Sequence, residues 1–258
     1  MAAPAGIGTA LRRAGRRLRR VTRPVSLPRG RHHPPHGIAP LTPEQQAAVE
    51  GFFRVYYEQR ISGRETVRLN WLGYRIYKCP FDLWSYQEIV VETRPDLVVE
   101  CGTRFGGGAL FLATIMDLLG AGEVLTIDTA AAERPPHPRI RYLTGSTVDP
   151  GIFAQVRRAS QGRRTMVILD SDHRAEHVAA ELRLYPELVT PGCYLIVDDT
   201  SIDGDPGWEG FGAGPMAALE GFLATTNDFE VDRDRERFML TLNPRGFLRR
   251  RELPRRPA

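Results

Sequence analysis

Short apolar runs alternate with longer segments of helical periodicity from about residue 97 onward. Each apolar run has the length and composition of a strand that is buried on both faces of a parallel sheet. The segments between the runs predict helices, one of them reaching about residue 119. This alternation predicts an α/β fold with a mostly parallel sheet and helices on both faces. The first predicted strand begins at Leu97 and is followed by the acid Glu100, and the other predicted strands cover 124–127, 140–143, 166–169 and 194–197.

The N-terminal third has a different pattern. Thr42, Pro43 and Glu44 form a helix-start signal, and the helix is expected to reach about Arg60. Residues 69–80 are rich in aromatic side chains and predict an extended segment. Asp82 is expected to cap a following helix over 83–91.

The C-terminal part also departs from simple alternation. Residues 229–232 and 237–242 are two apolar segments joined by a short charged turn, which predicts an antiparallel hairpin.

The expected organisation is a basic tail, one domain and a second basic tail. The domain divides into an N-terminal helical and aromatic part and a Rossmann-like core. The boundaries are 1–40 for the first tail, 41–96 and 97–247 for the two parts of the domain, and 248–258 for the second tail.

Two of the predicted strands end on acidic residues. Asp170 follows the run at 166–169, and Asp198 and Asp199 follow the run at 194–197. Ligands of open α/β sheets bind beyond the carboxyl ends of the strands, so neighbouring strands would bring these acids together. Like charges that close repel unless a proton or a cation lies among them, and oxygen ligands suit Mg²⁺, Mn²⁺ or Ca²⁺. The alternative is that these acids only cap helices.

A glycine-rich turn follows the strand that begins at Leu97 and the acid Glu100. Its pattern, E-x-G-x-x-x-G-G, differs from the G-x-G-x-x-G that binds a dinucleotide pyrophosphate. Asp128 ends the next strand, where a carboxylate can hold ribose hydroxyls. A ligand with a ribose and no pyrophosphate fits S-adenosylmethionine. The cofactor-binding residues that we expect are Glu100, Gly102, Thr103, Gly106, Gly107, Asp128, Ser146 and Asp170.

The net charge of +4 conceals an uneven distribution. Residues 1–40 carry +9 and residues 245–258 carry +5, which leaves −10 for the body of the chain. An acidic body would repel a phosphate backbone, so nucleic acid is not an expected partner. No apolar run is long enough to span a bilayer. Three cysteines without metal-binding spacing are typical of a reducing cytoplasm.

Other features have two interpretations each. His173 and His177 form an H-x-x-x-H pattern that could bind zinc, but Glu176 is misplaced for H-E-x-x-H, and we expect His177 to be an ordinary helix-surface residue. Asp172 either supports the metal ligands from outside or caps the helix that starts near Arg174, and we favour the cap. The glycine-rich segment 202–215 is either a substrate lid or a plain solvent loop, and its place after Asp199 favours the lid.

Taken together, the motifs resemble the cephalosporin hydroxylase family of class I methyltransferases, which includes metal-dependent O-methyltransferases acting on macrolide and rhamnosyl sugars. The resemblance covers about 70–247. Gly108 and Asp198 stand where relatives more often have serine and glutamate. The matching segments are Trp71-x-Gly73, Lys78-x-Pro80-x-Asp82-Leu83, Tyr86-Gln87-Glu88, Arg94-Pro95-Asp96, Glu100-Cys101-Gly102-Thr103, Gly106-Gly107, Thr126-Ile127-Asp128, Ile168–His173, Pro191-Gly192-x-Tyr194, Asp198-Asp199-Thr200 and Asn243-Pro244-x-Gly246.

The resemblance implies a seven-stranded Rossmann-like sheet and an enzyme that uses S-adenosylmethionine. It also implies that Asp170, Asp198 and Asp199 bind Mg²⁺ (or Mn²⁺) and that His173 is the general base, with Asp170 also in the catalytic centre. The expected acceptor is a hydroxyl of a sugar or glycosylated natural product. An NAD-dependent sugar-modifying enzyme and a non-catalytic partner protein are the alternatives. The acceptor's identity and the oligomeric state stay open, a homo-oligomer being one option.

Overall fold

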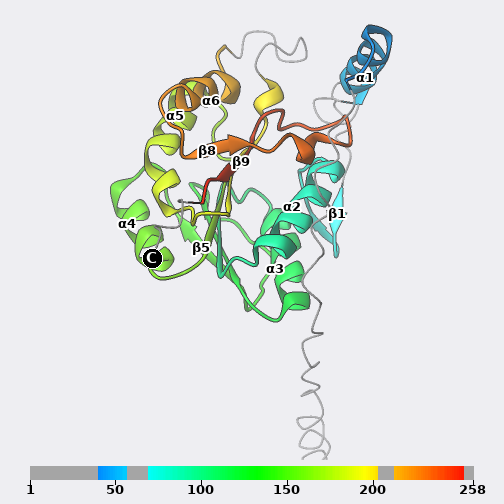
Figure 1. Ribbon diagram of the computed structural model, residues 1–258. Helices are drawn as coiled ribbons and strands as arrows, with labels where there is room; N and C mark the ends of the chain where they lie inside the picture. The colour runs from blue at the N-terminus through cyan, green and yellow to red at the C-terminus, as the bar shows by residue number, and fades with distance from the viewer. Residues whose placement is uncertain (1–39, 57–68, 203–211, 253–258) are drawn as a thin grey trace, which may run out of the picture.

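The computed structural model of the 258-residue chain describes residues 40–56, 69–202 and 212–252. Its centre is a seven-stranded sheet with the order β5-β4-β3-β6-β7-β9-β8 (Figure 1). Strands β3 to β7 are parallel, and β9 runs antiparallel to both β7 and β8. This is the predicted seven-stranded, mostly parallel sheet. The strands are β3 (Leu97–Cys101), β4 (Glu123–Asp128), β5 (Ile140–Thr144), β6 (Thr165–Leu169), β7 (Tyr194–Val197), β8 (Phe229–Val231) and β9 (Phe247–Arg250).

Helices cover both faces of the sheet, as Figure 1 shows. One face packs against α2 (Pro80–Thr93) and α3 (Gly107–Leu119). The other packs against α4 (Pro150–Ser160), α5 (Ala175–Leu184) and α6 (Pro215–Leu223). Alternate residues of each strand point to opposite faces, so Val98 packs in the first core and its neighbour Val99 in the second. Short 3₁₀ helices follow at Tyr185–Leu188, Thr200–Ile202 and Arg233–Glu236.

The N-terminal part adds two elements outside the sheet. Helix α1 (Pro43–Tyr56) starts at the predicted residue and has no buried side chains, although Phe53 is partly buried against Cys79 and Leu242. Its predicted end at Arg60 lies outside the described residues. Strands β1 (Asn70–Trp71) and β2 (Tyr74–Arg75) form a small hairpin in the predicted extended segment. Trp71 connects this hairpin to α3 through a hydrogen bond, in which its Nε1 donates to Thr114 Oγ1 at 3.1 Å.

The predicted C-terminal hairpin pairs the wrong segments. Strand β8 forms where it was expected, but its partner is β9 at Phe247–Arg250, and residues 237–242 form no strand. The antiparallel pair is therefore present, but the segment that connects its two strands is longer than the predicted turn. Strand β9 lies inside the sheet between β7 and β8 and extends past the predicted boundary at residue 247. Side chains of β9 reach the core, where Phe247 and Leu248 are fully buried.

Asp82 is not the cap of its helix. Helix α2 begins at Pro80 and its N-cap residue is Cys79, while Asp82 lies in the first turn and is buried. Its carboxylate instead accepts hydrogen bonds from Thr241 Oγ1 at 2.5 Å and from the Leu242 backbone N–H at 2.9 Å. The residue thus joins α2 to a segment 160 positions later in the chain. A helix-start pattern could not reveal this partner.

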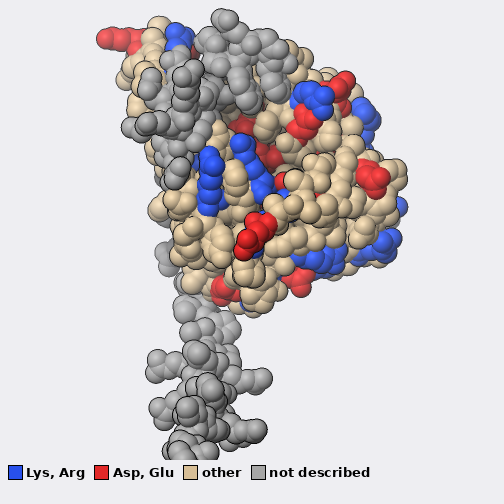
Figure 2. Space-filling view, turned by 180° about the vertical axis from the view of Figure 1, so that it is seen from behind, with Lys and Arg blue, Asp and Glu red and all other residues tan. Residues whose placement is uncertain are grey.

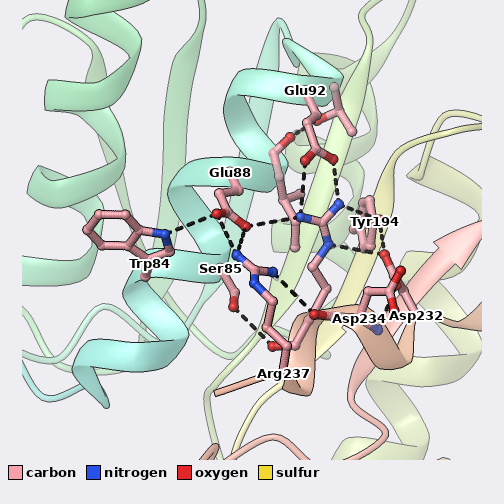
Figure 3. Close-up of polar contacts among 11 residues, drawn as sticks. Trp84, Ser85, Glu88, Glu92, Tyr194, Asp232, Asp234 and Arg237 are labelled. Carbon is pink, nitrogen blue, oxygen red and sulfur yellow. Dashed lines mark hydrogen bonds and ion pairs between the residues drawn. The ribbon is translucent and has the colours of Figure 1, made fainter. Parts of the chain in front are cut away.

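A second connection between α2 and the C-terminal segment is an ion network around the buried Arg235 (Figure 3). The Arg235 guanidinium donates to Asp232 at 3.1 Å, to Glu92 on α2 at 3.2 Å and to the Tyr194 hydroxyl at 3.2 Å. The Arg235 carbonyl accepts from Ser85 Oγ at 3.1 Å. A guanidinium has five donors in a fixed plane, so one arginine can hold both elements in register.

Three further observations complete the fold. Among the described residues, none of the helices has the length and apolar composition of a transmembrane span. Cys79, Cys101 and Cys193 are buried free thiols. The tail at 1–39, most of the segment 202–215 and the last six residues lie outside the described residues, so the predictions for them stay predictions.

Candidate active site

The strand-end acids meet as predicted at the carboxyl edge of the sheet. Asp170 follows β6, and Asp198 and Asp199 follow the neighbouring strand β7. The backbone continues the sheet here, since the Asp198 N–H donates to the Leu169 carbonyl at 2.9 Å. Asp199 has a φ of 55°, a left-handed conformation that is uncommon for a residue with a side chain. Such conformations concentrate at functional sites.

Three side chains at this edge converge on one point. Ligand atoms of Asp170, His173 and Asp199 all lie within 4.8 Å of one another, and His173 Nε2 is 3.4 Å from Asp199 Oδ2. Two carboxylate oxygens and an imidazole nitrogen are donors that a divalent cation accepts. The described residues therefore include one group whose geometry is suited to a metal ion.

Asp198 has different partners from those expected of a metal ligand. It is 3% exposed, and its oxygens contact Lys78 Nζ, the Tyr86 hydroxyl and Asn243 Nδ2, the last at 3.0 Å. Asn243 also accepts from the Asp199 backbone N–H at 2.8 Å, so one amide positions both acids. Asp198 is therefore held by these three side chains, while Asp170, His173 and Asp199 converge beside it, and its predicted role as a metal ligand stays a prediction.

Lys78, Tyr86 and Asn243 are the site residues that sequence reasoning did not assign. Lys78 stands between the acids, with its Nζ 2.6 Å from Asp170 Oδ2. All three residues were within the matching motifs, which was the available signal. Local patterns could not reveal their roles, because each contacts an acid that lies between 45 and 120 positions away in the chain.

Burial dominates the electrostatics of this site. It raises the pKa of the Asp170, Asp198 and Asp199 carboxyls, and Lys78 opposes the rise at Asp170 and Asp198. Burial also raises the pKa of Glu100 to about 7, again with Lys78 acting in the opposite direction. Carboxylates in such surroundings gain from a nearby positive charge, because desolvation penalises each unpaired anion.

Two glycines of the turn lie close to the backbone of other segments of the protein. Gly102 has a φ of +99°, and a Cβ there would lie 1.8 Å from the Asp170 carbonyl oxygen. A Cβ on Gly107 would lie 2.3 Å from the Arg75 carbonyl oxygen. Both positions exclude any larger residue, and they bring the turn against the strand end that holds Asp170 and against Arg75 of β2.

The turn and the strand ends line one pocket. Glu100, Gly102, Thr103, Gly107, Asp128 and Asp170 are among its lining residues, together with Lys78, His173 and Asp199. Figure 2 shows one face of the molecule on which acidic and basic side chains lie side by side around a hollow. Gly106 starts α3 and Ser146 follows β5, and neither is among the residues that line this pocket. Their predicted contacts with the cofactor stay predictions.

Asp128 ends β4 at the pocket wall. Its carboxylate accepts from the Arg104 backbone N–H at 2.7 Å and from the Ala130 backbone N–H at 2.9 Å. Two residues earlier in β4, Thr126 Oγ1 donates to Oε2 of Glu100, another residue that lines the pocket, at 2.6 Å. Backbone donors thus hold the Asp128 carboxylate in one orientation. A fixed carboxylate at this strand end is suited to accept hydrogen bonds from a diol.

The zinc interpretation of His173 and His177 finds no support in the geometry. Helix α5 begins at Ala175, so His173 precedes the helix and the two imidazoles do not share a helical face. His177 instead lies 3.5 Å from Glu181 and 3.1 Å from Thr147 Oγ1, and it is partly buried, unlike the surface residue that we expected.

Asp172 is not the N-cap of α5. That position belongs to Arg174, whose backbone N–H donates to Asp172 Oδ1 at 3.0 Å. Asp172 also pairs with the Arg174 guanidinium, which lowers the pKa of Asp172 to about 2. The residue is therefore a turn acceptor just before the helix.

Comparison with known proteins agrees with this geometry. A sequence model of the family described as "Rhamnosyl O-methyltransferase/CmcI" matches residues 64–251. The chain is 37% identical over 211 residues to a protein named "Rhamnosyl O-methyltransferase" of Mycobacterium bovis (strain BCG / Pasteur 1173P2), an alignment that covers 78% of this chain and 84% of the relative. A protein of the same name from Mycobacterium leprae (strain TN) is also 37% identical over 211 residues, with 79% and 90% coverage.

Two solved structures share the fold. A structure described as "CmcI-N160 apo-structure" has a TM-score of 0.58 at 21% identity, covering 86% of this chain and 91% of its own. Another, described as "cmcI-D160 Mg-SAM", has a TM-score of 0.56 at 21% identity, covering 88% of both chains. At this identity the likeness is one of fold.

Proposed function

The chain belongs to the rhamnosyl O-methyltransferase/CmcI family and is an O-methyltransferase, and we propose that it methylates a hydroxyl of a sugar or glycoside with S-adenosylmethionine as donor and a divalent cation in the site. The observation that carries the proposal is the meeting of Asp170, His173 and Asp199 beside the glycine turn of β3. The relatives named rhamnosyl O-methyltransferase support a sugar as the acceptor.

The cofactor assignment rests on the pocket at the carboxyl edge of β3 and β4. Asp128 would hold the ribose, and Gly102 and Gly107, whose missing Cβ atoms let the turn pack against the backbone of Asp170 and Arg75, line the same pocket. One solved structure of the same fold is described with Mg and SAM, which supports the same pair here. The turn lacks the pyrophosphate pattern, which argues against the NAD-dependent alternative.

The donor set fits a divalent cation. Asp170 and Asp199 would hold Mg²⁺ or Mn²⁺, and their buried carboxyls gain from a positive charge. Asp198, the third predicted ligand, stands beside them but shares its oxygens with Lys78 and Tyr86. A cation bound there supplies Lewis-acid polarisation and a template for neighbouring hydroxyls of a sugar.

His173 would take the proton that the acceptor hydroxyl loses. Its imidazole reaches the same point as the Asp170 and Asp199 carboxylates, and Asp199 Oδ2 at 3.4 Å can orient the ring. The overall reaction forms a carbon–oxygen bond, breaks the carbon–sulfur bond of the sulfonium and moves one proton to the base. Most of the protein's contribution is alignment and exclusion of water, because the methyl transfer is an in-line displacement.

Metal removal tests this proposal directly. Turnover on a rhamnosylated or other glycosylated acceptor should disappear in a chelator and return with Mg²⁺ or Mn²⁺. Calorimetry with S-adenosylmethionine should show that the chelated protein still binds the cofactor, since Asp128 ends β4 and the acids that would hold the cation follow β6 and β7. Full turnover in the chelator would contradict the metal part of the proposal and leave the acids as structural groups.

A further inference from the structure

The sequence contains one lysine against 34 arginines, and that lysine lies among the strand-end acids. A composition so biased toward arginine places arginine wherever a basic residue of either kind suffices. A lysine at one buried position therefore points to a need for the smaller head group. The position is Lys78, in the segment between β2 and α2.

Lys78 is a largely buried residue of the site and contacts two of its acids. Its side chain is 9% exposed, its Nζ is 2.6 Å from Asp170 Oδ2, and it also contacts Asp198 Oδ2. The same ammonium lies 5.6 Å from the centre of the Tyr86 ring. It thus bridges the ends of two neighbouring strands, β6 and β7, from a third segment of the chain.

The charges around Lys78 explain why a cation is needed at this position. Glu100, Asp170, Asp198 and Asp199 place four carboxyl groups at one sheet edge, and all four are largely buried or line the pocket. Buried carboxylates that close destabilise the folded chain unless cations pair with them. A compact ammonium fits between two carboxylates, whereas a planar guanidinium needs a larger opening.

We propose that Lys78 is an internal counter-cation that holds Asp170 and Asp198 together in the metal-free protein and competes with the divalent cation for their charge. Lys78 is thereby a positioning residue that sets the metal affinity of the site. The inference rests on the proposed function, because the metal site is part of that proposal. It adds that the charge of Lys78 keeps the affinity of the site for the divalent cation below the affinity that the carboxylates alone would have.

Lys78→Met is the decisive variant, because it removes the charge and keeps the length of the side chain. Without metal, its melting temperature should fall by roughly 5 °C or more, since two buried carboxylates lose their partner. Its dissociation constant for Mn²⁺, measured by calorimetry, should fall by about tenfold or more, because a repelling charge is gone. Mn²⁺ should therefore restore most of the lost melting temperature.

Two controls separate charge from packing. Lys78→Arg keeps the charge, so its affinity for Mn²⁺ should be no tighter than that of the parent. Arg235→Met removes another buried cation between acids, but among the described residues those acids do not converge as a metal site requires. It should lose melting temperature, and Mn²⁺ should raise its melting temperature by no more than it raises that of the parent, so the deficit remains. Lys78→Gln, which also lacks the charge, serves if the methionine variant does not fold.

The outcomes are distinct. A parent protein that binds no Mn²⁺ overturns both the proposed metal site and this inference. A parent that binds Mn²⁺, with Lys78→Met binding it equally or more weakly, overturns the inference alone and leaves Lys78 as a packing residue. Tighter Mn²⁺ binding in Lys78→Met but not in Lys78→Arg establishes the counter-cation.

Discussion

Asp128 is the residue through which the cofactor proposal is tested most simply. Its carboxylate is oriented by the Arg104 and Ala130 backbone N–H groups and faces the pocket. Asp128→Ala should weaken S-adenosylmethionine binding by about 10- to 100-fold, because hydrogen bonds to a charged group contribute about 1.5–3 kcal/mol. Isothermal titration calorimetry measures the change.

Asp149→Ala is the matched control for Asp128. Asp149 caps α4, accepting from the Gly151 and Ile152 backbone N–H groups at 2.8 and 2.9 Å. Its loss should cost about 1 kcal/mol of stability and leave cofactor affinity unchanged. Unchanged binding in Asp128→Ala would show that the ribose does not meet this strand end.

His173 is the residue that tests the general base. His173→Ala should retain cofactor binding and lose about 10²–10⁴-fold in rate. The loss should shrink as the pH rises, because hydroxide can partly replace the imidazole. The rate–pH profile of the variant measures this directly. His177→Ala is the control, since that imidazole contacts Thr147 and Glu181 and lies outside the converging group. An equal loss in both variants would speak against a base at His173.

At the scale of elements, helix α2 connects the active site to the C-terminal segment. Tyr86 on α2 contacts Asp198, Asp82 binds the 241–242 backbone and side chain, and Glu92 pairs with Arg235. These contacts along its length make α2 a support for the strand-end acids. Its position is set by polar partners from the far end of the chain and by the apolar core that it shares with α3.

Asp82 predicts a pH dependence of stability. Burial raises its pKa to about 7, above the ordinary value of 3.8. Between those values the unfolded chain releases a proton that the folded chain keeps, so stability is lost as the pH rises from about 4 to about 7. Asp82→Asn should be the more stable protein at pH 8 by roughly 2–4 kcal/mol, from about 1.4 kcal/mol per pKa unit.

Denaturant unfolding of parent and Asp82→Asn at several pH values measures this difference. Glu176→Gln, at a side chain that is 81% exposed, controls for the loss of one negative charge. Parallel stability–pH curves for the parent and Asp82→Asn would show that Asp82 is ionised in the folded protein throughout this range.

At the scale of the whole molecule, the sheet and its two helical layers account for the buried cores. Both large core clusters are built from residues between 69 and 248. The first forty residues carry nine arginines, six prolines and no acid, a composition that buries little apolar surface. We therefore predict that deleting residues 1–40 leaves the melting temperature and small-molecule turnover unchanged. A large drop in melting temperature on deletion would contradict this.

The sequence by itself determined the order of elements in the α/β core and the chemistry at their ends. Strands β3 to β7 form within a residue or two of their predicted positions, because short apolar runs that are buried on both faces have few other ways to fold. The acids at 170, 198 and 199 and the glycines at 102 and 107 were also found, since their meaning depends only on the strand that precedes them.

The tertiary structure decided which distant residues these groups meet. Asp198 pairs with Lys78, Tyr86 and Asn243, Asp82 binds residues 241–242, and β8 pairs with β9 instead of with the nearer apolar segment. Local patterns encode propensity and periodicity, which act over a few residues. Long-range pairing depends on the summed burial of apolar surface and the partnering of every buried polar group, and these are properties of the folded chain alone.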